Sequence, residues 1–282
     1  MSKKIIKAQV TGKHQNRTAL GMMTAFVAMH PSVNTSTLKE MFTTKDVCPD
    51  AGISQLFYSK SEIEQEQANG NEWFINDNAC FTKDGEWLTL GNGRKLAFNK
   101  VWTAKSLEKL QTALADYGIT GEVGTVDKSA TAGFEICFES VEVQVTGKFQ
   151  NRTALGMMAA YVALNPSLTA EELNEQFPMK EICPDAGVEK LFFSEDEIDE
   201  LIASGNEWFI NGNACFDKDG EWLELGDGQK VAFNKVWTAK SLEKLQTALA
   251  EHGITGEVGS VDKSAVAGYV IDFDNSTQTI VF

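Results

Sequence analysis

Several features that would point to a membrane, a metal or a nucleotide are missing from this sequence. No stretch approaches the roughly 18 apolar residues of a membrane-spanning helix, and residues 1–7 are too polar for the apolar core of a signal peptide. There is no Cys-x-x-Cys, none of the five cysteines has a histidine nearby at metal-ligand spacing, and no Gly-Lys-Ser/Thr occurs. We therefore expect a cytoplasmic protein without metal or cofactor, whose cysteines are free, mostly buried thiols.

Positive charge is also scarce. The 282 residues include 25 Lys and Arg against 40 Asp and Glu, which gives a net charge of −15. This balance disfavours non-specific binding to nucleic acid or an anionic membrane, and it favours either a basic partner or simply solubility. With 43% hydrophobic residues, 17 Phe and 6 Trp, the chain has enough apolar material for folded domains.

What the chain does contain is an internal repeat. Residues 7–138 align with residues 142–273 at a constant offset of 135, without gaps and with about two-thirds of the pairs identical. No Gly-, Ser- or Pro-rich linker separates the copies. We predict an α+β protein made of two tandem domains, residues 1–139 and 140–282, in a pseudo-two-fold arrangement.

Each copy is expected to pack about four helices on a small antiparallel β-meander. Asn16 should cap the first helix, and capping-box patterns at Thr169 and Ser194 should begin the second and third helices of the second copy. Thr103 and Thr238 should cap the fourth helices. Cys-Pro-Asp-Ala-Gly segments (48–52, 183–187) should break regular structure.

The meander is predicted from short runs at residues 72–75, 79–81, 86–90 and 95–98. Asp-Gly and Asn-Gly pairs between such runs supply the positive φ angles of tight hairpins. A loop over 119–132 should lead to a final strand at 134–138. Residues 277–282 are expected to close an otherwise open sheet edge.

The two copies differ in charge. Residues 1–141 carry 15 basic and 16 acidic residues, whereas residues 142–282 carry 10 and 24. Much of the excess falls on the second and third predicted helices of the second copy: Glu171, Glu172, Glu175, Glu195, Asp196, Glu197, Asp199 and Glu200, with Glu189 nearby. Such carboxylates can mimic a phosphate backbone, but acidic helix starts are also favoured by the helix dipole, so both interpretations stay open.

No catalytic constellation is shared by the copies. His14, His30 and His252 align with Phe149, Asn165 and Tyr117, so no histidine is duplicated, although a one-site enzyme stays open. Acids beside tryptophans leave a carbohydrate site as a further alternative: Glu72, Asp84 and Glu86 near Trp73 and Trp87, and Glu207, Asp219 and Glu221 near Trp208 and Trp222.

A second hypothesis is a nucleic-acid-binding or regulatory protein, because helix and hairpin order loosely follows a winged helix. Its contacts would be a basic arm and a Lys/Trp cluster: Lys3, Lys4, Lys7, Lys13 and Arg17, with Lys100, Trp102, Lys105 and Lys109. The acidic third helix argues against it. The preferred hypothesis is a non-enzymatic interaction protein, an acidic inhibitor or nucleic-acid mimic that docks on a basic, nucleic-acid-binding protein partner, as in phage counter-defence.

Overall fold

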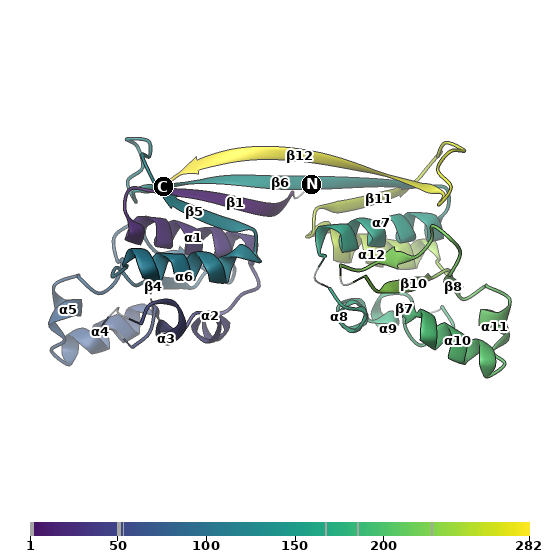
Figure 1. Ribbon diagram of the computed structural model, residues 1–282, viewed down its shortest axis with the longest axis horizontal. Coiled ribbons are helices and arrows are strands. Elements are labelled where there is room, and N and C mark those ends of the chain that lie inside the picture. The colour runs from purple at the N-terminus through teal and green to yellow at the C-terminus, as the bar shows by residue number, and fades with distance from the viewer. Residues whose placement is uncertain (1–2, 50–51, 53, 167, 185, 227) are drawn as a thin grey trace. The chain divides into compact units, whose positions relative to one another are not determined.

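The computed structural model describes residues 3–49, 52, 54–166, 168–184, 186–226 and 228–282 (Figure 1). The chain forms two compact units. Ile5–Ser140 and Ser276–Phe282 make up the first-repeat unit, and Met1–Lys4 with Val141–Asn275 make up the second-repeat unit. Helices and several sheets occur in both, so the fold is mixed α/β.

The first-repeat unit contains a parallel strand pair and a separate antiparallel sheet. Its helices are α1 (Gln15–Met29), α2 (Thr35–Met41), α3 (Thr44–Val47), α4 (Lys60–Ala68), α5 (Glu72–Ile75) and α6 (Ala104–Ala115). Its strands are β1 (Lys4–Gly12), β2 (Phe57–Tyr58), β3 (Leu88–Thr89), β4 (Lys95–Phe98), β5 (Ile119–Val123) and part of β6 (Phe134–Gly147). β1 pairs parallel with β5, while β4 pairs antiparallel with β2 and β3.

Helix α1 is buried because it lies directly against these strands, as Figure 1 shows. A Cβ atom on Gly21 would lie 2.5 Å from Val10 Cγ1 and 2.9 Å from Phe134 Cδ2. Glycine at this position therefore permits the close approach of helix and sheet. Nearly all of the central residues of α1 are buried, which explains its apolar sequence on every face.

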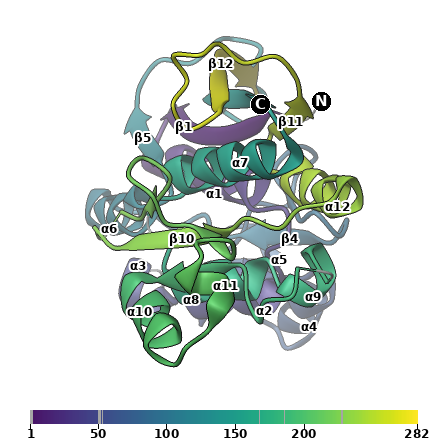
Figure 2. The same ribbon diagram turned by 90° about the vertical axis from the view of Figure 1, so that its right-hand side faces the viewer.

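The second-repeat unit has corresponding elements. Its helices are α7 (Gln150–Leu164), α8 (Ala170–Gln176), α9 (Met179–Ile182), α10 (Glu195–Ala203), α11 (Glu207–Ile210) and α12 (Ala239–Ala250). Its strands are β7 (Phe192–Ser194), β8 (Cys215–Phe216), β9 (Leu223–Glu224), β10 (Lys230–Asn234), β11 (Ile254–Val258) and parts of β6 and β12 (Tyr269–Val281). β11 pairs parallel with β6, and β10 pairs antiparallel with β7, β8 and β9. Within this unit, α7 and α12 separate β11 from the layer of α8 to α11 (Figure 2).

Most of the predicted helix caps are confirmed. Thr103 and Thr238 cap α6 and α12, and Thr169 and Ser194 form full capping boxes at α8 and α10. The turn glycines have positive φ angles, +83° at Gly85 for example. Parts of the remaining predictions lie outside the described residues, namely Asp50, Ala51 and Asp185 of the Cys-Pro-Asp-Ala-Gly segments and Asp227 of one turn.

Two local predictions were wrong at helix starts. α1 begins at Gln15 with His14 as its N-cap, so Asn16 already lies inside the helix. Residues 72–75 form α5 and not a strand, because the Asn71 side chain accepts the Trp73 backbone N–H at 3.2 Å and begins a helical turn.

The meander is shorter than predicted, and a parallel strand was missed. Residues 79–81 contribute only a bridge between Cys80 and Asn99, and 86–90 contribute only β3. The predicted loop over 119–132 opens with β5, because Gly118, at φ +70°, turns the chain from α6 directly into a strand beside β1. The α6–β5 connection gives the first-repeat unit its parallel pair, and the α12–β11 connection does the same in the second-repeat unit.

The C-terminal segment closes a sheet edge, as predicted. β12 pairs with β6, and in the first-repeat unit the Phe282 N–H donates to Phe134 O at 3.1 Å. The two rings stack with centroids 4.9 Å apart and planes 19° apart. Residue 282 is therefore part of the packing of the first-repeat unit.

The cysteines are thiols in the described part of the chain, where no disulfide forms. Cys48, Cys80, Cys183 and Cys215 are buried and Cys137 is half-buried. Burial raises the pKa of Cys80 and of Cys215 to about 12, which keeps both thiols protonated. Among the described residues, no helix combines the length and apolarity that crossing a bilayer requires.

Candidate partner-binding pocket

The predicted acidic face lies on two helices of the second-repeat unit. α8 carries Glu171, Glu172 and Glu175, and α10 carries Glu195, Asp196, Glu197, Asp199 and Glu200. All of these residues are exposed except Glu197, which is half-buried. Two of them also take part in capping their own helix. Glu172 accepts the Thr169 N–H at 2.9 Å, and Glu197 accepts the Ser194 N–H at 2.8 Å.

A cavity of about 760 Å³ adjoins α10 and is called the acidic pocket below. It is bounded by residues 187–190, β7, α10 and α11. Its apolar lining consists of Val188, Phe193, Leu201, Trp208 and Phe209, and its charged lining consists of Glu189, Lys190, Glu197 and Glu200. Three carboxylates against one ammonium leave the lining with a net negative charge, and aromatic side chains that converge with polar groups are typical of binding sites.

Local structure sets the orientation of the aromatic side chains. Gly205, at φ +83°, ends α10, and Asn206 then accepts the Trp208 N–H at 3.1 Å to begin α11. On this short helix Phe209 turns inward onto Phe193, with ring centroids 5.1 Å apart and planes 70° apart. Trp208 remains 47% exposed and presents its indole to the pocket.

Lys190 provides the positive charge of the pocket. Its ammonium pairs with Glu197 and lies 5.4 Å from the centroid of the Phe193 ring. Burial alone would raise the pKa of Glu197, but hydrogen bonds from Lys190 and Ser194 outweigh it and hold the pKa below its usual value. Glu197 is therefore ionised at neutral pH.

The matching region of the first-repeat unit has other chemistry. Ser54, Gln55, Gln65 and Glu66 stand where the second repeat has Glu189, Lys190, Glu200 and Leu201. The Ser54 hydroxyl lies 3.4 Å from the Tyr58 hydroxyl, and the Gln55 amide donates to Glu62 at 3.1 Å. Tyr58, Trp73 and Phe74 keep this face aromatic, and Glu62 and Glu66 keep it acidic, so the difference lies in the positions of the charges and in the apolar Leu201.

A smaller cavity of about 320 Å³ lies on a different side of α4 and α5 in the first-repeat unit. Its apolar lining includes Ile63, Phe74, Ile75 and Trp87. Its charged lining residues are Lys60, Glu64 and Asp77, so it lacks the carboxylate excess of the acidic pocket.

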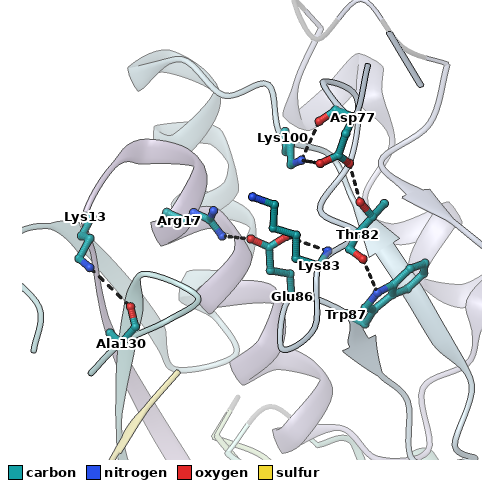
Figure 3. A network of polar contacts seen from close by, with 9 residues as sticks. All are labelled: Lys13, Arg17, Asp77, Thr82, Lys83, Glu86, Trp87, Lys100 and Ala130. Carbon is teal, nitrogen blue, oxygen red and sulfur yellow. Dashed lines mark hydrogen bonds and ion pairs between the residues drawn. The ribbon is translucent and has the colours of Figure 1, made fainter. Parts of the chain in front are cut away.

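Several of the predicted basic contacts are engaged in internal bonds (Figure 3). Arg17 Nη1 donates to Glu86 Oε1 at 2.6 Å, and its guanidinium lies 4.6 Å from the centroid of the Phe81 ring. Lys100 Nζ lies 2.9 Å from Asp77 Oδ2. Glu86 is only 4% exposed, so Arg17 neutralises a buried charge.

The remaining basic residues do not gather on one element. Lys3 and Lys4 belong to the second-repeat unit, where Lys3 lies 3.8 Å from Asp274 and Lys4 donates to Asn165 at 2.7 Å. The others belong to the first-repeat unit. There Lys7 lies 3.9 Å from Glu139, Lys13 donates to Ala130 O at 3.5 Å, Trp102 donates to Asn99 O at 2.9 Å, and Lys105 and Lys109 lie on α6.

The carboxylates considered for a carbohydrate site differ in their burial and partners. Glu86 and Glu221 are buried partners of Arg17 and Arg152, each at 2.6 Å, whereas Glu72 and Glu207 are exposed at the starts of α5 and α11. The described residues contain no group of three or more His, Cys, Asp or Glu side chains arranged to hold a metal ion.

The chain matches no protein-family model, no curated protein and no solved structure. The sequence reasoning named the pocket carboxylates Glu189, Glu197 and Glu200, but it did not identify Val188, Phe193, Leu201 and Phe209 as binding residues. The available signal was the change from Glu66 to Leu201 between the repeats, which places an apolar residue within an acidic helix.

Proposed function

We propose that this chain is a non-enzymatic interaction protein whose second-repeat unit docks on a basic segment of a protein partner. The supporting observation is the acidic pocket, which combines an aromatic lining with three carboxylates on the more acidic repeat. In its most specific form, the proposal is that the chain inhibits a nucleic-acid-binding protein by occupying its basic surface, as in phage counter-defence.

Two physical effects would cooperate in such binding. Carboxylates on α8 and α10 attract a basic surface over several ångströms and accelerate the encounter. Aromatic side chains in the pocket then bury apolar surface of the partner at short range, which acidic helices alone do not do. Salt should therefore weaken binding without abolishing the preference for a particular partner.

The near-neutral first repeat has a different role in this proposal. Residues 1–139 and 140–282 are taken as tandem copies in a pseudo-two-fold pair that share their packing, and the second copy carries the binding surface. The compartment is the cytoplasm, where cysteine thiols remain reduced.

The direct test is fluorescence anisotropy with a labelled peptide of about 20 residues rich in Arg, Lys and Leu. Binding should be clear at about 0.05 M salt and weaker at about 0.5 M. A variant with Glu195→Gln, Asp196→Asn, Asp199→Asn and Glu200→Gln should bind at least about tenfold more weakly, a loss of about 1.4 kcal/mol.

A matched control removes the same number of exposed carboxylates from the first-repeat unit: Glu40→Gln, Glu64→Gln, Glu108→Gln and Glu122→Gln. This control should bind like the wild type. Equal weakening by both variants, binding that is unchanged at high salt, or absence of peptide binding would overturn the proposal. Retention of duplex or single-stranded DNA in a gel shift at physiological salt would favour the nucleic-acid-binding alternative.

A further inference from the structure

We propose, building on the function above, that the acidic pocket is a subsite for one arginine side chain of the partner. Lys190 already places a cation over the Phe193 ring and beside Glu197. The protein thus contains, within its own chain, a cation bound by the pocket's aromatic and carboxylate groups. The ligand that repeats these contacts from outside is a cationic side chain.

The net negative charge of the pocket lining favours the binding of a second cation. Lys190 offsets one of three carboxylates, and its pair partner is Glu197. Glu189 and Glu200 are exposed at the same cavity. A guanidinium entering the pocket would find carboxylates to accept its N–H groups, and the planar fork of arginine suits carboxylates better than a lysine ammonium does.

The aromatic lining selects for the same side chain. Trp208 is 47% exposed, whereas Phe193 and Phe209 are only 4% and 6% exposed. The indole is therefore the accessible aromatic group of the lining, and a guanidinium would stack on it while its methylene stem covers Val188 or Leu201. At about 760 Å³, the cavity is large enough for the arginine and part of its neighbours.

The first repeat provides an internal comparison. There the residue at the position of Glu197 is Glu62, which pairs with Lys39 of α2 at 2.6 Å. The second repeat has Asn174 at the position of Lys39 and Lys190 at the position of Gln55. The cation that neutralises this glutamate has thus moved from α2 to the pocket lining, where a ligand can compete with it.

Two labelled nonapeptides of equal charge, nona-arginine and nona-lysine, test the inference by anisotropy. Wild-type protein should bind nona-arginine at least about fivefold more tightly. Trp208→Ala should remove that preference. Trp73→Ala, an equally exposed tryptophan in the same Asn-Glu-Trp-Phe-Ile-Asn sequence, should keep it.

Lys190→Gln should tighten nona-arginine binding by about threefold or more, because a competing cation is removed. Weaker binding of this variant would overturn the inference. Should Trp208→Ala fail to fold by circular dichroism, the variant Glu189→Ser with Glu200→Gln carries residues that the first repeat has at these positions, and it too should lose the preference.

The outcomes separate the two proposals. Equal, salt-dependent binding of both nonapeptides overturns the arginine subsite and leaves the acidic docking function in place. If neither nonapeptide binds, both proposals fail. Unchanged preference after Trp208→Ala in folded protein overturns the subsite, because the pocket is then not the source of discrimination.

Discussion

The first-repeat and second-repeat units use the same buried contacts around different outer helices. Arg17 and Arg152 each reach a buried glutamate at 2.6 Å and lie 4.6 Å from the centroid of a phenylalanine ring. Helices α4 and α10 differ, because α4 has a single acid in its first turn and α10 has three. The comparison separates residues that maintain the fold from residues that one repeat uses for its own surface.

The largest expected effect comes from the buried ion pairs. Arg152→Ala leaves Glu221 buried without its cation and should lower the free energy of unfolding by about 3–5 kcal/mol. Arg17→Ala should cost less, because Glu86 Oε2 still accepts the Lys83 N–H at 3.1 Å, whereas Glu221 Oε2 has no hydrogen-bond partner among the described residues. Urea unfolding of both variants measures the difference. Equal losses would mean that the Lys83 contact contributes nothing.

A smaller effect is expected at the end of β12. Phe282→Ala removes the ring stacked on Phe134 and should destabilise the first-repeat unit by about 2 kcal/mol. Phe273→Ala is the control, since that ring is 46% exposed and its loss should cost less than about 0.5 kcal/mol. Amide hydrogen exchange should locate the first change around β1 and β6. An effect confined to the second-repeat unit would contradict the contact.

Helix caps should respond equally in the two units. Ser59→Ala and Ser194→Ala each remove the side-chain acceptor of a capping box and should each cost about 1 kcal/mol. Thermal unfolding of the two variants checks this equality. A clearly larger loss for Ser194→Ala would show that the acidic start of α10 depends more on its cap than α4 does.

The smallest expected effect is the loss of stability at low pH. Burial tends to raise the pKa of Glu62, but hydrogen bonds from Lys39, Ser59 and Gln55 lower it to about 2. A lowered carboxyl pKa stabilises the fold above the unfolded value near 4.5, and this contribution disappears as the pH falls towards 2. The pKa of Glu197 is lowered too, and both carboxylates are more than one-third exposed, so the effect on stability should be small.

Carboxyl-detected NMR titration of wild-type protein measures these pKa values directly. Glu62→Gln should remove the corresponding part of the acid dependence. A Glu62 pKa at or above 4.5 would contradict the bonds that the structure assigns to it.

Local signals were readable from the sequence, whereas contacts between distant residues were not. Capping by Ser194 and Thr103 depends on neighbours within three residues, so the pattern was sufficient. β5 was missed because Gly121 and Gly124 resemble a loop until β1 is known to lie beside them. Asn71 was missed as a cap because the run that follows it resembles a strand.

The candidate site was only partly predictable for the same reason. Carboxylates on α10 were visible as a run of acids, but the pocket needs Phe193 and Trp208 from other elements. Arg17 was considered a nucleic-acid contact because it belongs to a basic arm without acids. Its partner, Glu86, is remote in the sequence. Pairing of this kind is decided by the tertiary fold and cannot be inferred from neighbouring residues.

The stacking of Phe282 on Phe134 also has a consequence for synthesis. Although the first repeat emerges from the ribosome early, its unit includes residues 276–282, which are made only after the whole second repeat. During that interval the edge of β6 later covered by Phe282 lacks its partner. The first-repeat unit is therefore complete only once residues 276–282 have been synthesised, and until then the exposed strand is a point at which nascent chains associate with one another or with a chaperone.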